Sequence, residues 1–239
     1  MELRAETGNT RGLARSVAAT CRNTTDAVRK EIAASYLDAY YREWYELQDA
    51  EGYYFRPPKM SGSQVNAYLH HKIEGMNWED RLKGHFRDYV TGVSTMIKAG
   101  KNARLTDSQI KDSIKALTGT VGESGVTYNI ERILRTETNA AVNDAIQSVF
   151  KRAGIEKYYY NSMLDDKSCT VCDDLDWKSH RKPFLVKEAK TGKNLPPMHP
   201  NCRCFTEPVM SDKFKKMADK KGKKSRHISY ATWHRRYVQ

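Results

Sequence analysis

Apolar residues in the first half of the chain recur at helical spacing. From residue 26 to residue 48 they form two adjacent stripes with a period of four, which are Val28, Ile32, Tyr36, Tyr40 and Trp44 in one and Ala33, Leu37, Tyr41 and Tyr45 in the other. Two such stripes side by side predict a long helix with one wide buried face. We interpret the tyrosines as core residues rather than as a cofactor site. Gly52 and the segment Arg56-Pro57-Pro58 are expected to end this helix.

Two further helices are predicted from the residues that begin and end them. A short helix is expected over residues 63–75. Asn77 is typical of the residue that caps the N-terminus of a helix, and Asp80 follows in the first turn, where negative charge is favoured. We expect Gly100 to adopt the left-handed conformation that commonly follows the end of a helix.

A fourth helix and a flexible link complete the first half. Thr106 and Gln109 have the spacing of a capping box, in front of apolar residues at positions 110, 114 and 117. The glycine-rich stretch 118–125 follows, and it lacks the Gly-Lys-Ser/Thr of a phosphate-binding loop. We place the main domain boundary within this stretch, between residues 120 and 121.

The pattern changes in the second half, where one long helix precedes several short strands. The helix is predicted over residues 128–152, with Gly154 at its end, and strands are predicted at 155–160, 182–186 and 205–209. The predicted fold class is α+β. It has a mainly helical N-terminal half, then a long helix packed on a small antiparallel sheet with an irregular cysteine-rich side. The expected domains are a helical region at 1–120, an α+β domain at 121–210 and a basic C-terminal tail at 211–239.

Positive charge is concentrated at the C-terminus. The chain has a net charge of +12, and residues 211–239 contain seven lysines, three arginines and two aspartates, which amounts to +8. Such a segment suits a polyanion, most simply double-stranded DNA, although a solvated tail that maintains solubility is the alternative. The candidate DNA-binding residues are Lys215, Lys216, Lys220, Lys221, Lys223, Lys224, Arg226, Arg235 and Arg236.

The remaining composition favours a protein made in the cytosol. No run approaches the roughly 20 apolar residues of a membrane-spanning helix, and the N-terminus lacks the apolar core of a signal peptide. We therefore expect no membrane partner. In a reducing compartment, clustered cysteines favour metal binding or free thiols over disulfides.

Four of the five cysteines lie in one segment with metal-ligand spacing. Two residues separate Cys169 from Cys172, and two separate His199 from Cys202. Cys204 lies two positions after Cys202. Pro196, Pro197 and Pro200 stiffen the second group. Thiolates and imidazole are the ligands of structural zinc sites. We expect Cys169, Cys172 and Cys202 as zinc ligands, with His199 or Cys204 as the fourth.

Two alternatives to zinc remain open at this point. In one, the cysteines are buried thiols and His199 is a hydrogen-bonding hub under the proline-rich turn. In the other, a disulfide joins the two groups. Arg203 lies between two cysteines, where its charge would offset a thiolate-rich site.

Carboxylates near the first cysteine pair also suggest a zinc-stapled, metal-dependent nuclease. They are Asp165, Asp166, Asp173, Asp174 and Asp176, and His180 and His199 are the available general bases. No ordered His-Asn-His pattern is present, so we interpret the acidic run as a solvated turn and retain the nuclease as the alternative. We predict that the protein is not an enzyme.

Arg135 and Glu137 lie two positions apart on the long predicted helix. Residues at this spacing do not face each other, so each either pairs elsewhere, with the cysteine segment or a partner chain, or is a solvated surface charge.

These motifs together resemble one protein family. The order and spacing of Arg135-Thr136-Glu137, Asp165, the Cys169–Cys172 pair and the Pro-Pro-x-His-Pro-Asn-Cys-Arg-Cys element, which includes Pro196, Pro197, Asn201 and Arg203, are similar to those of the phage head-morphogenesis family. This family contains the Mu F-like minor head proteins. The resemblance covers roughly residues 105–208, nearly half of the chain.

The resemblance implies a structural role in procapsid assembly rather than catalysis. It implies a portal protein as partner, a scaffold or major capsid protein as a further contact, and for some members contact with packaged DNA. The implied location is the host cytoplasm during assembly and then the interior of the virion head. On this interpretation the motif residues serve the fold rather than chemistry, and a DNA-binding module without a portal partner is a further alternative.

Overall fold

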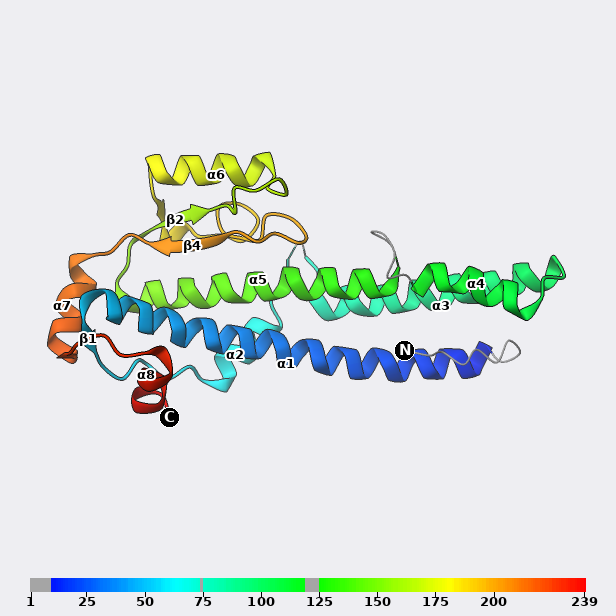
Figure 1. Ribbon diagram of the computed structural model, residues 1–239, viewed down its shortest axis with the longest axis horizontal. Helices are drawn as coiled ribbons and strands as arrows, with labels where there is room; N and C mark the ends of the chain where they lie inside the picture. The colour runs from blue at the N-terminus through cyan, green and yellow to red at the C-terminus, as the bar shows by residue number, and fades with distance from the viewer. Residues whose placement is uncertain (1–9, 74, 119–124) are drawn as a thin grey trace. The chain divides into compact units, whose positions relative to one another are not determined.

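The computed structural model describes residues 10–73, 75–118 and 125–239 (Figure 1). The described residues form a mainly helical α+β fold, as predicted. Its helices are α1 (Thr10–Glu51), α2 (Gly62–Leu69), α3 (Trp78–Asn102), α4 (Asp107–Thr118), α5 (Val126–Ala153), α6 (Thr170–Arg181), α7 (Asp212–Lys221) and α8 (Tyr230–Tyr237). Its strands are β1 (Tyr53–Tyr54), β2 (Lys157–Asn161), β3 (Phe184–Leu185), β4 (Phe205–Pro208) and β5 (Lys223–Lys224). None of the described helices has the length and apolar character needed to cross a bilayer.

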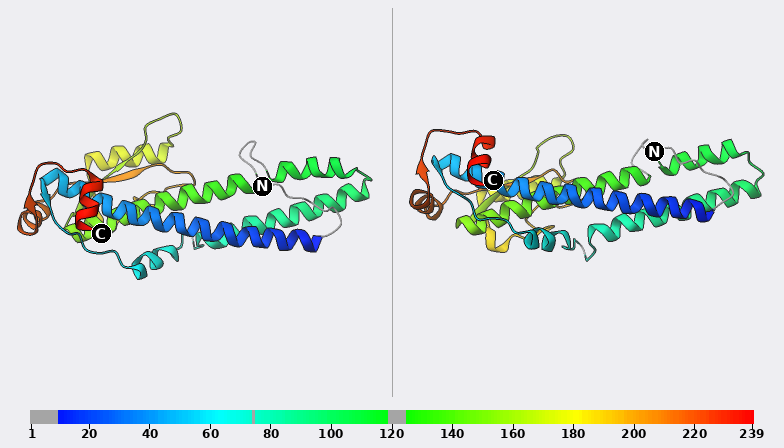
Figure 2. Two further views of the ribbon diagram at one scale, coloured as in Figure 1. Left: turned by 60° about the horizontal axis from the view of Figure 1, so that its bottom comes forward. Right: turned by 90° about the horizontal axis from the view of Figure 1, so that it is seen from below.

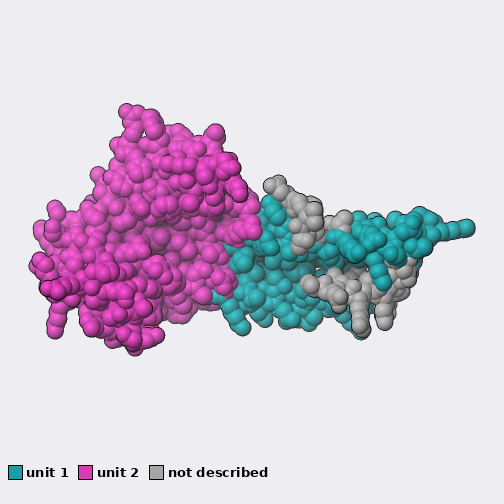
Figure 3. All heavy atoms as spheres, viewed as in Figure 1, with its two compact units in different colours: residues 1–30, 72–134 teal, residues 31–71, 135–239 magenta. Residues whose placement is uncertain are grey.

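The chain divides into two compact units, which Figure 3 colours separately. Unit 1 comprises residues 1–30 and 72–134, and unit 2 comprises residues 31–71 and 135–239. The boundaries of these units do not coincide with those of the three ranges expected from sequence, because α1 and α5 each contribute residues to both units. Residues 119–124, which include the expected boundary, lie outside the described residues.

In unit 1, the predicted helix starts are confirmed and one predicted end is wrong. The Asn77 side chain accepts a hydrogen bond from the Asp80 amide at 2.9 Å, and Thr106 and Gln109 form the reciprocal bonds of a capping box. Gly100 does not end α3 in a left-handed conformation. It lies inside the helix, where α4 packs so closely that a Cβ at this position would be 2.6 Å from Ile110.

Two other helices differ from prediction in length. The first helix begins at Thr10 rather than near residue 26, since no glycine or proline interrupts the chain from Leu13 to Glu51. The short helix α2 ends at Leu69, before the expected position near Gly75.

Unit 2 contains the predicted sheet, with the strand order β3-β2-β4 and both pairings antiparallel. Helix α6 lies over one face of this sheet and the C-terminal part of α5 lies against the other (Figure 1). The side chains of Tyr158 and Tyr160 are both fully buried, as expected at alternate positions of the central strand. Helix α6 was not predicted, so the irregular side of the domain is in part a regular helix.

The basic C-terminal segment, residues 211–239, forms two helices and a short strand that fold onto the end of α1, and its basic side chains face solvent (Figure 2). Strand β5 pairs with β1, and Phe214, Ala218 and Trp233 are buried. The Trp233 indole donates a hydrogen bond to Gln48 Oε1 at 3.1 Å. The hydroxyl of Tyr45 likewise donates to the carbonyl of Ile228 at 2.7 Å.

Candidate functional site

The first cysteine pair begins helix α6. Cys169 is the N-cap residue, with its Sγ 3.4 Å from the amide of Cys172, which donates to it. Cys172 lies in the first turn and is 1% exposed. A helix start is a favourable place for thiolates, because its amides and its dipole both favour negative charge.

The second group of candidate ligands lies in the loop before β4. Leu195, Pro196 and Pro197 are buried at its beginning, and the Pro196–Pro197 peptide bond is cis. Asn201 has a φ of 62°, the left-handed conformation that asparagine tolerates better than most residues. The backbone N–H of Asn201 donates a hydrogen bond to Thr136 Oγ1 on α5 at 3.0 Å. This bend directs the chain from His199 back through Cys202 to Cys204.

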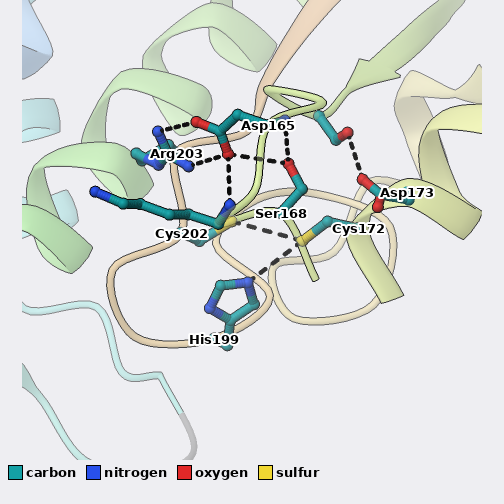
Figure 4. Close-up of polar contacts among 9 residues, drawn as sticks. Asp165, Ser168, Cys172, Asp173, His199, Cys202 and Arg203 are labelled. Atoms are coloured by element: carbon teal, nitrogen blue, oxygen red, sulfur yellow. Dashed lines mark hydrogen bonds and ion pairs between the residues drawn. The ribbon is translucent and has the colours of Figure 1, made fainter. Parts of the chain in front are cut away.

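The fold brings all five predicted metal ligands together, and Figure 4 shows Cys172, His199 and Cys202 among them. Cys172 lies at the centre, with its Sγ 3.4 Å from His199 Nε2 and 4.0 Å from Cys202 Sγ. The ligand atoms form two overlapping triplets, each with all members within 4.8 Å of one another. The first triplet is Cys169, Cys172 and His199, and the second is Cys172, Cys202 and Cys204.

The five cysteines are free thiols, including Cys21 in α1. Burial raises the pKa of the Cys172 thiol to about 12. The hydrogen bond from Cys204 lowers the pKa of Cys202 to about 5, and the same bond raises the pKa of Cys204. The cluster therefore contains one thiol that gives up its proton much more readily than its neighbours.

His199 presents one defined nitrogen to the cysteines. Its Nδ1 lies 2.9 Å from the carbonyl oxygen of Pro200, which can only accept a hydrogen bond, so Nδ1 carries the proton. In the neutral ring, Nε2 is then left with a lone pair directed at Cys172.

Asp165 and Arg203 close the cluster on its outer side. The Arg203 guanidinium donates two hydrogen bonds to the Asp165 carboxylate, at 2.7 and 2.6 Å. This interaction lowers the pKa of Asp165 to about 2. Arg203 therefore pairs with a carboxylate of the turn before α6, which adds a partner that the sequence did not reveal.

Three of the other acidic residues around the cysteines, Asp173, Asp174 and Asp176, also have local partners. Asp173 accepts a hydrogen bond from the Ser162 hydroxyl at 2.8 Å, and Asp176 accepts one from the Ser162 amide at 2.7 Å. Asp174 pairs with Lys178 one turn along α6. The acidic run thus fastens α6 to the end of β2, in addition to forming a solvated surface. His180 stacks on Tyr159 at 4.8 Å between ring centroids and lies near Asn161, outside both ligand triplets.

Sequence reasoning missed a polar row on α5 that supports the second cysteine group. The side-chain amides of Asn139 and Asn143 donate to the Cys204 carbonyl at 2.9 and 3.2 Å, and Gln147 donates to Thr206. With Thr136 these residues recur every three or four positions along an otherwise apolar face, a spacing that is visible in the sequence. Of the two predicted motif charges beside Thr136, Arg135 is exposed, whereas Glu137 is 5% exposed and is no solvated surface charge.

The predicted DNA-binding residues form the outer surface of the C-terminal segment. All nine are exposed, and none takes part in an ion pair with a described residue. They are carried by α7 and α8 and by the residues between these helices. Lys213, which was not in the predicted set, pairs with Glu156.

Comparison with known proteins identifies the region that contains the cysteine cluster. Residues 90–207 match the family model described as phage Mu protein F like protein. This segment includes α5, α6, the three-stranded sheet except its last residue, and all five candidate ligands. No protein of curated function and no solved structure is significantly similar to the chain. Through residues 90–207, the chain belongs to the phage Mu F-like family of head-morphogenesis proteins.

Proposed function

We propose that this protein is a structural minor head protein, which acts at the portal during procapsid assembly and contacts packaged DNA. The observation that carries the proposal is the family match over residues 90–207, which contains the whole cysteine cluster. Membership in a head-morphogenesis family supports assembly with other head components. The portal protein is the partner we propose, with a scaffold or major capsid protein as a further contact. The protein would then act in the host cytoplasm during assembly and afterwards inside the head.

The C-terminal segment supports the DNA contact. Nine lysine and arginine side chains are exposed there without an ion-pair partner among the described residues, so their charge is available to phosphates. The buried side chains of Phe214 and Trp233 hold the backbone that carries them. A fixed basic surface of this kind binds duplex DNA through its backbone, without sequence preference.

The environment of the cysteine cluster favours a structural role over catalysis. Asp165, Asp173 and Asp176 are each engaged with a side chain or an amide of the surrounding turn and strand. We therefore propose that these residues hold the fold and do not take part in a reaction. The competing function is a metal-dependent nuclease, in which His199 would be the general base.

DNA binding by the full chain tests the role of the basic surface. The Lys215→Gln, Lys216→Gln, Lys220→Gln, Lys221→Gln quadruple variant should weaken binding to duplex DNA in fluorescence anisotropy. Each lost phosphate contact should flatten the slope of log affinity against log salt by about 0.9. The matched control is a quadruple variant of four exposed lysines elsewhere in unit 2, at Lys182, Lys187, Lys190 and Lys193. An equal loss in both variants would show that net charge alone, and not this surface, attracts DNA.

Two further measurements address the assembly role. The protein co-expressed with the portal protein of the same phage should co-purify with it, and failure to do so would contradict the proposed partner.

The purified protein incubated with DNA and Mg²⁺, Mn²⁺ or Zn²⁺ should leave the DNA intact. Cleavage that is lost in His199→Ala would instead establish the nuclease.

A further inference from the structure

A small, half-open space lies beside the cysteine cluster, and several potential metal ligands line it. The cavity has a volume of about 20 Å³, and Cys169, Cys172, His199 and Cys204 are among the residues that line it. A space of about 10–15 Å³ is enough for one water molecule, so this cavity is large enough for a single ion or water but for nothing larger.

The spacing of the ligand atoms is close to that of a zinc site. With Zn–S bonds of about 2.3 Å and Zn–N bonds of about 2.0 Å, ligand atoms around a tetrahedral ion lie about 3.5–3.8 Å apart. The Cys172 Sγ is 3.4 Å from His199 Nε2 and 4.0 Å from Cys202 Sγ. Small movements of the two triplets toward their common member, Cys172, would therefore complete a tetrahedral set.

The surroundings of the cluster have the features that orient zinc ligands. The Pro200 carbonyl binds Nδ1 of His199 and leaves Nε2 directed at the cluster, an arrangement typical of ligating histidines. The amide of Cys172 donates to the sulfur of Cys169, so a thiolate at Cys169 would be stabilised by the start of α6.

We propose that this cluster binds one Zn²⁺ ion, with Cys169, Cys172 and His199 as three ligands and a thiolate of the Cys202–Cys204 pair as the fourth. The thiols release their protons to solvent when the ion binds. The ion joins the start of α6 to the loop before β4, two segments about 30 residues apart in the sequence. Its role is structural, since all four positions are taken by the protein.

Zinc content of the purified full chain tests the proposal. Protein expressed with zinc supplied should retain about one ion per chain after dialysis. The single variants Cys169→Ser, Cys172→Ser and His199→Ala and the double variant Cys202→Ser, Cys204→Ser should lose most of it, whereas His199→Cys should keep it. The matched controls are Cys21→Ser, in unit 1, and His180→Ala, outside both ligand triplets, and both should retain the ion.

A second measurement does not depend on whether the variants fold. Unsubstituted protein loaded with Co²⁺ in place of zinc should show the strong visible bands and the sulfur-to-metal charge-transfer absorption of a tetrahedral thiolate site. Absence of these bands, absence of retained zinc, or a disulfide between Cys172 and Cys202 in the purified protein would each overturn the proposal. Zinc retained equally by Cys172→Ser and by the two controls would overturn it as well.

Discussion

Buried polar groups around Cys172, Cys202 and Cys204 point inward and form what we call the inward-facing region, whereas the basic side chains of residues 211–239 point outward. In the first region, the hydroxyl of Tyr160 donates to Cys172 Sγ at 3.3 Å, and the buried amide of Asn143 donates to the carbonyl of Cys204. In the second, nine basic side chains are exposed and form no ion pair within the described part of the chain, over a buried layer that includes Phe214 and Trp233. Buried polar groups with partners specify a fold, whereas exposed unpaired charges are available to other molecules.

The difference assigns separate tasks to two sets of residues that both look functional in the sequence. Changes in the inward-facing region should reduce stability first. Changes to the exposed charges should alter DNA binding with little effect on stability, since surface substitutions are usually worth less than about 0.5 kcal/mol. Only the buried anchors of the C-terminal segment should affect its folding.

The largest expected effect is that of replacing Trp233, a buried residue beneath the basic surface. A large loss of stability would show that the basic surface depends on this buried layer. Trp233 is fully buried, contacts the Tyr45 and Tyr230 rings and donates to Gln48. Trp233→Ala leaves a cavity and removes one of the two hydrogen bonds that Gln48 Oε1 accepts, the other being from the Phe55 amide. It should therefore lower the free energy of unfolding by about 3–5 kcal/mol. Urea denaturation followed by circular dichroism measures this loss.

The control for Trp233 is the exposed Trp177, which is 57% exposed and lies under the Arg181 guanidinium on α6. Trp177→Ala should cost less than about 1 kcal/mol, because its contact with Arg181 is made in solvent. Equal costs for the two alanine variants would mean that residues 211–239 are not an integral part of the fold. The contrast between the two regions would then fail.

The second expected effect tests the inward-facing region through Asn143, which is fully buried. Its amide donates to the carbonyls of Cys204 and Asn139, and its Oδ1 accepts from the Thr206 hydroxyl at 3.4 Å. Asn143→Ala should therefore cost about 1–3 kcal/mol of stability, because the groups it binds are also buried. The same denaturation experiment measures it. The exposed Asn66 on α2 provides the control, since Asn66→Ala should change stability by less than about 0.5 kcal/mol.

The elements of this fold were predictable where apolar residues recur strongly. The stripes from Val28 to Trp44 and the aromatic run before Asn161 correctly indicate α1 and β2. Helix α6 escaped prediction because its buried positions include Cys172 and Ser179, which a hydrophobic pattern does not register. Gly100 was misread because its role is set by α4 packing against it, a contact between helices rather than a local preference.

The candidate site was predictable as a set of residues but not as an arrangement. Spacing alone selects the four clustered cysteines and His199, and the fold does bring them together. Their supports could not be identified in the same way, because Thr136 and Asn143 reach the loop before β4 only after α5 packs on the sheet. The pairing of Arg203 with Asp165 likewise joins residues 38 positions apart.

The smallest expected effect concerns this Asp165–Arg203 pair, which lies at the outer edge of the inward-facing region. Both side chains are partly exposed, so water and salt screen the interaction and its contribution is modest. The pKa of Asp165 is lowered to about 2 in the folded protein, below the value of about 3.9 expected for an unfolded chain. A lowered pKa means that the stabilisation is present above about pH 4 and is lost as the pH falls toward about 2.

Thermal unfolding at a series of pH values, in low salt, measures this contribution. Asp165→Asn should lower the melting temperature slightly near neutral pH and should reduce the decline between about pH 4 and pH 2. Arg203→Lys keeps the positive charge but not the paired donors, so it should reproduce part of the loss. The control is Asp174→Asn, which removes the exposed carboxylate that pairs with Lys178 on α6. This variant should still lose stability between about pH 4 and pH 2, because Asp165 is unchanged. If Asp165→Asn and Asp174→Asn give the same dependence of melting temperature on pH, the Asp165–Arg203 pair contributes no more to stability than an ordinary surface ion pair. The inward-facing region then ends at the cysteines and does not include this pair.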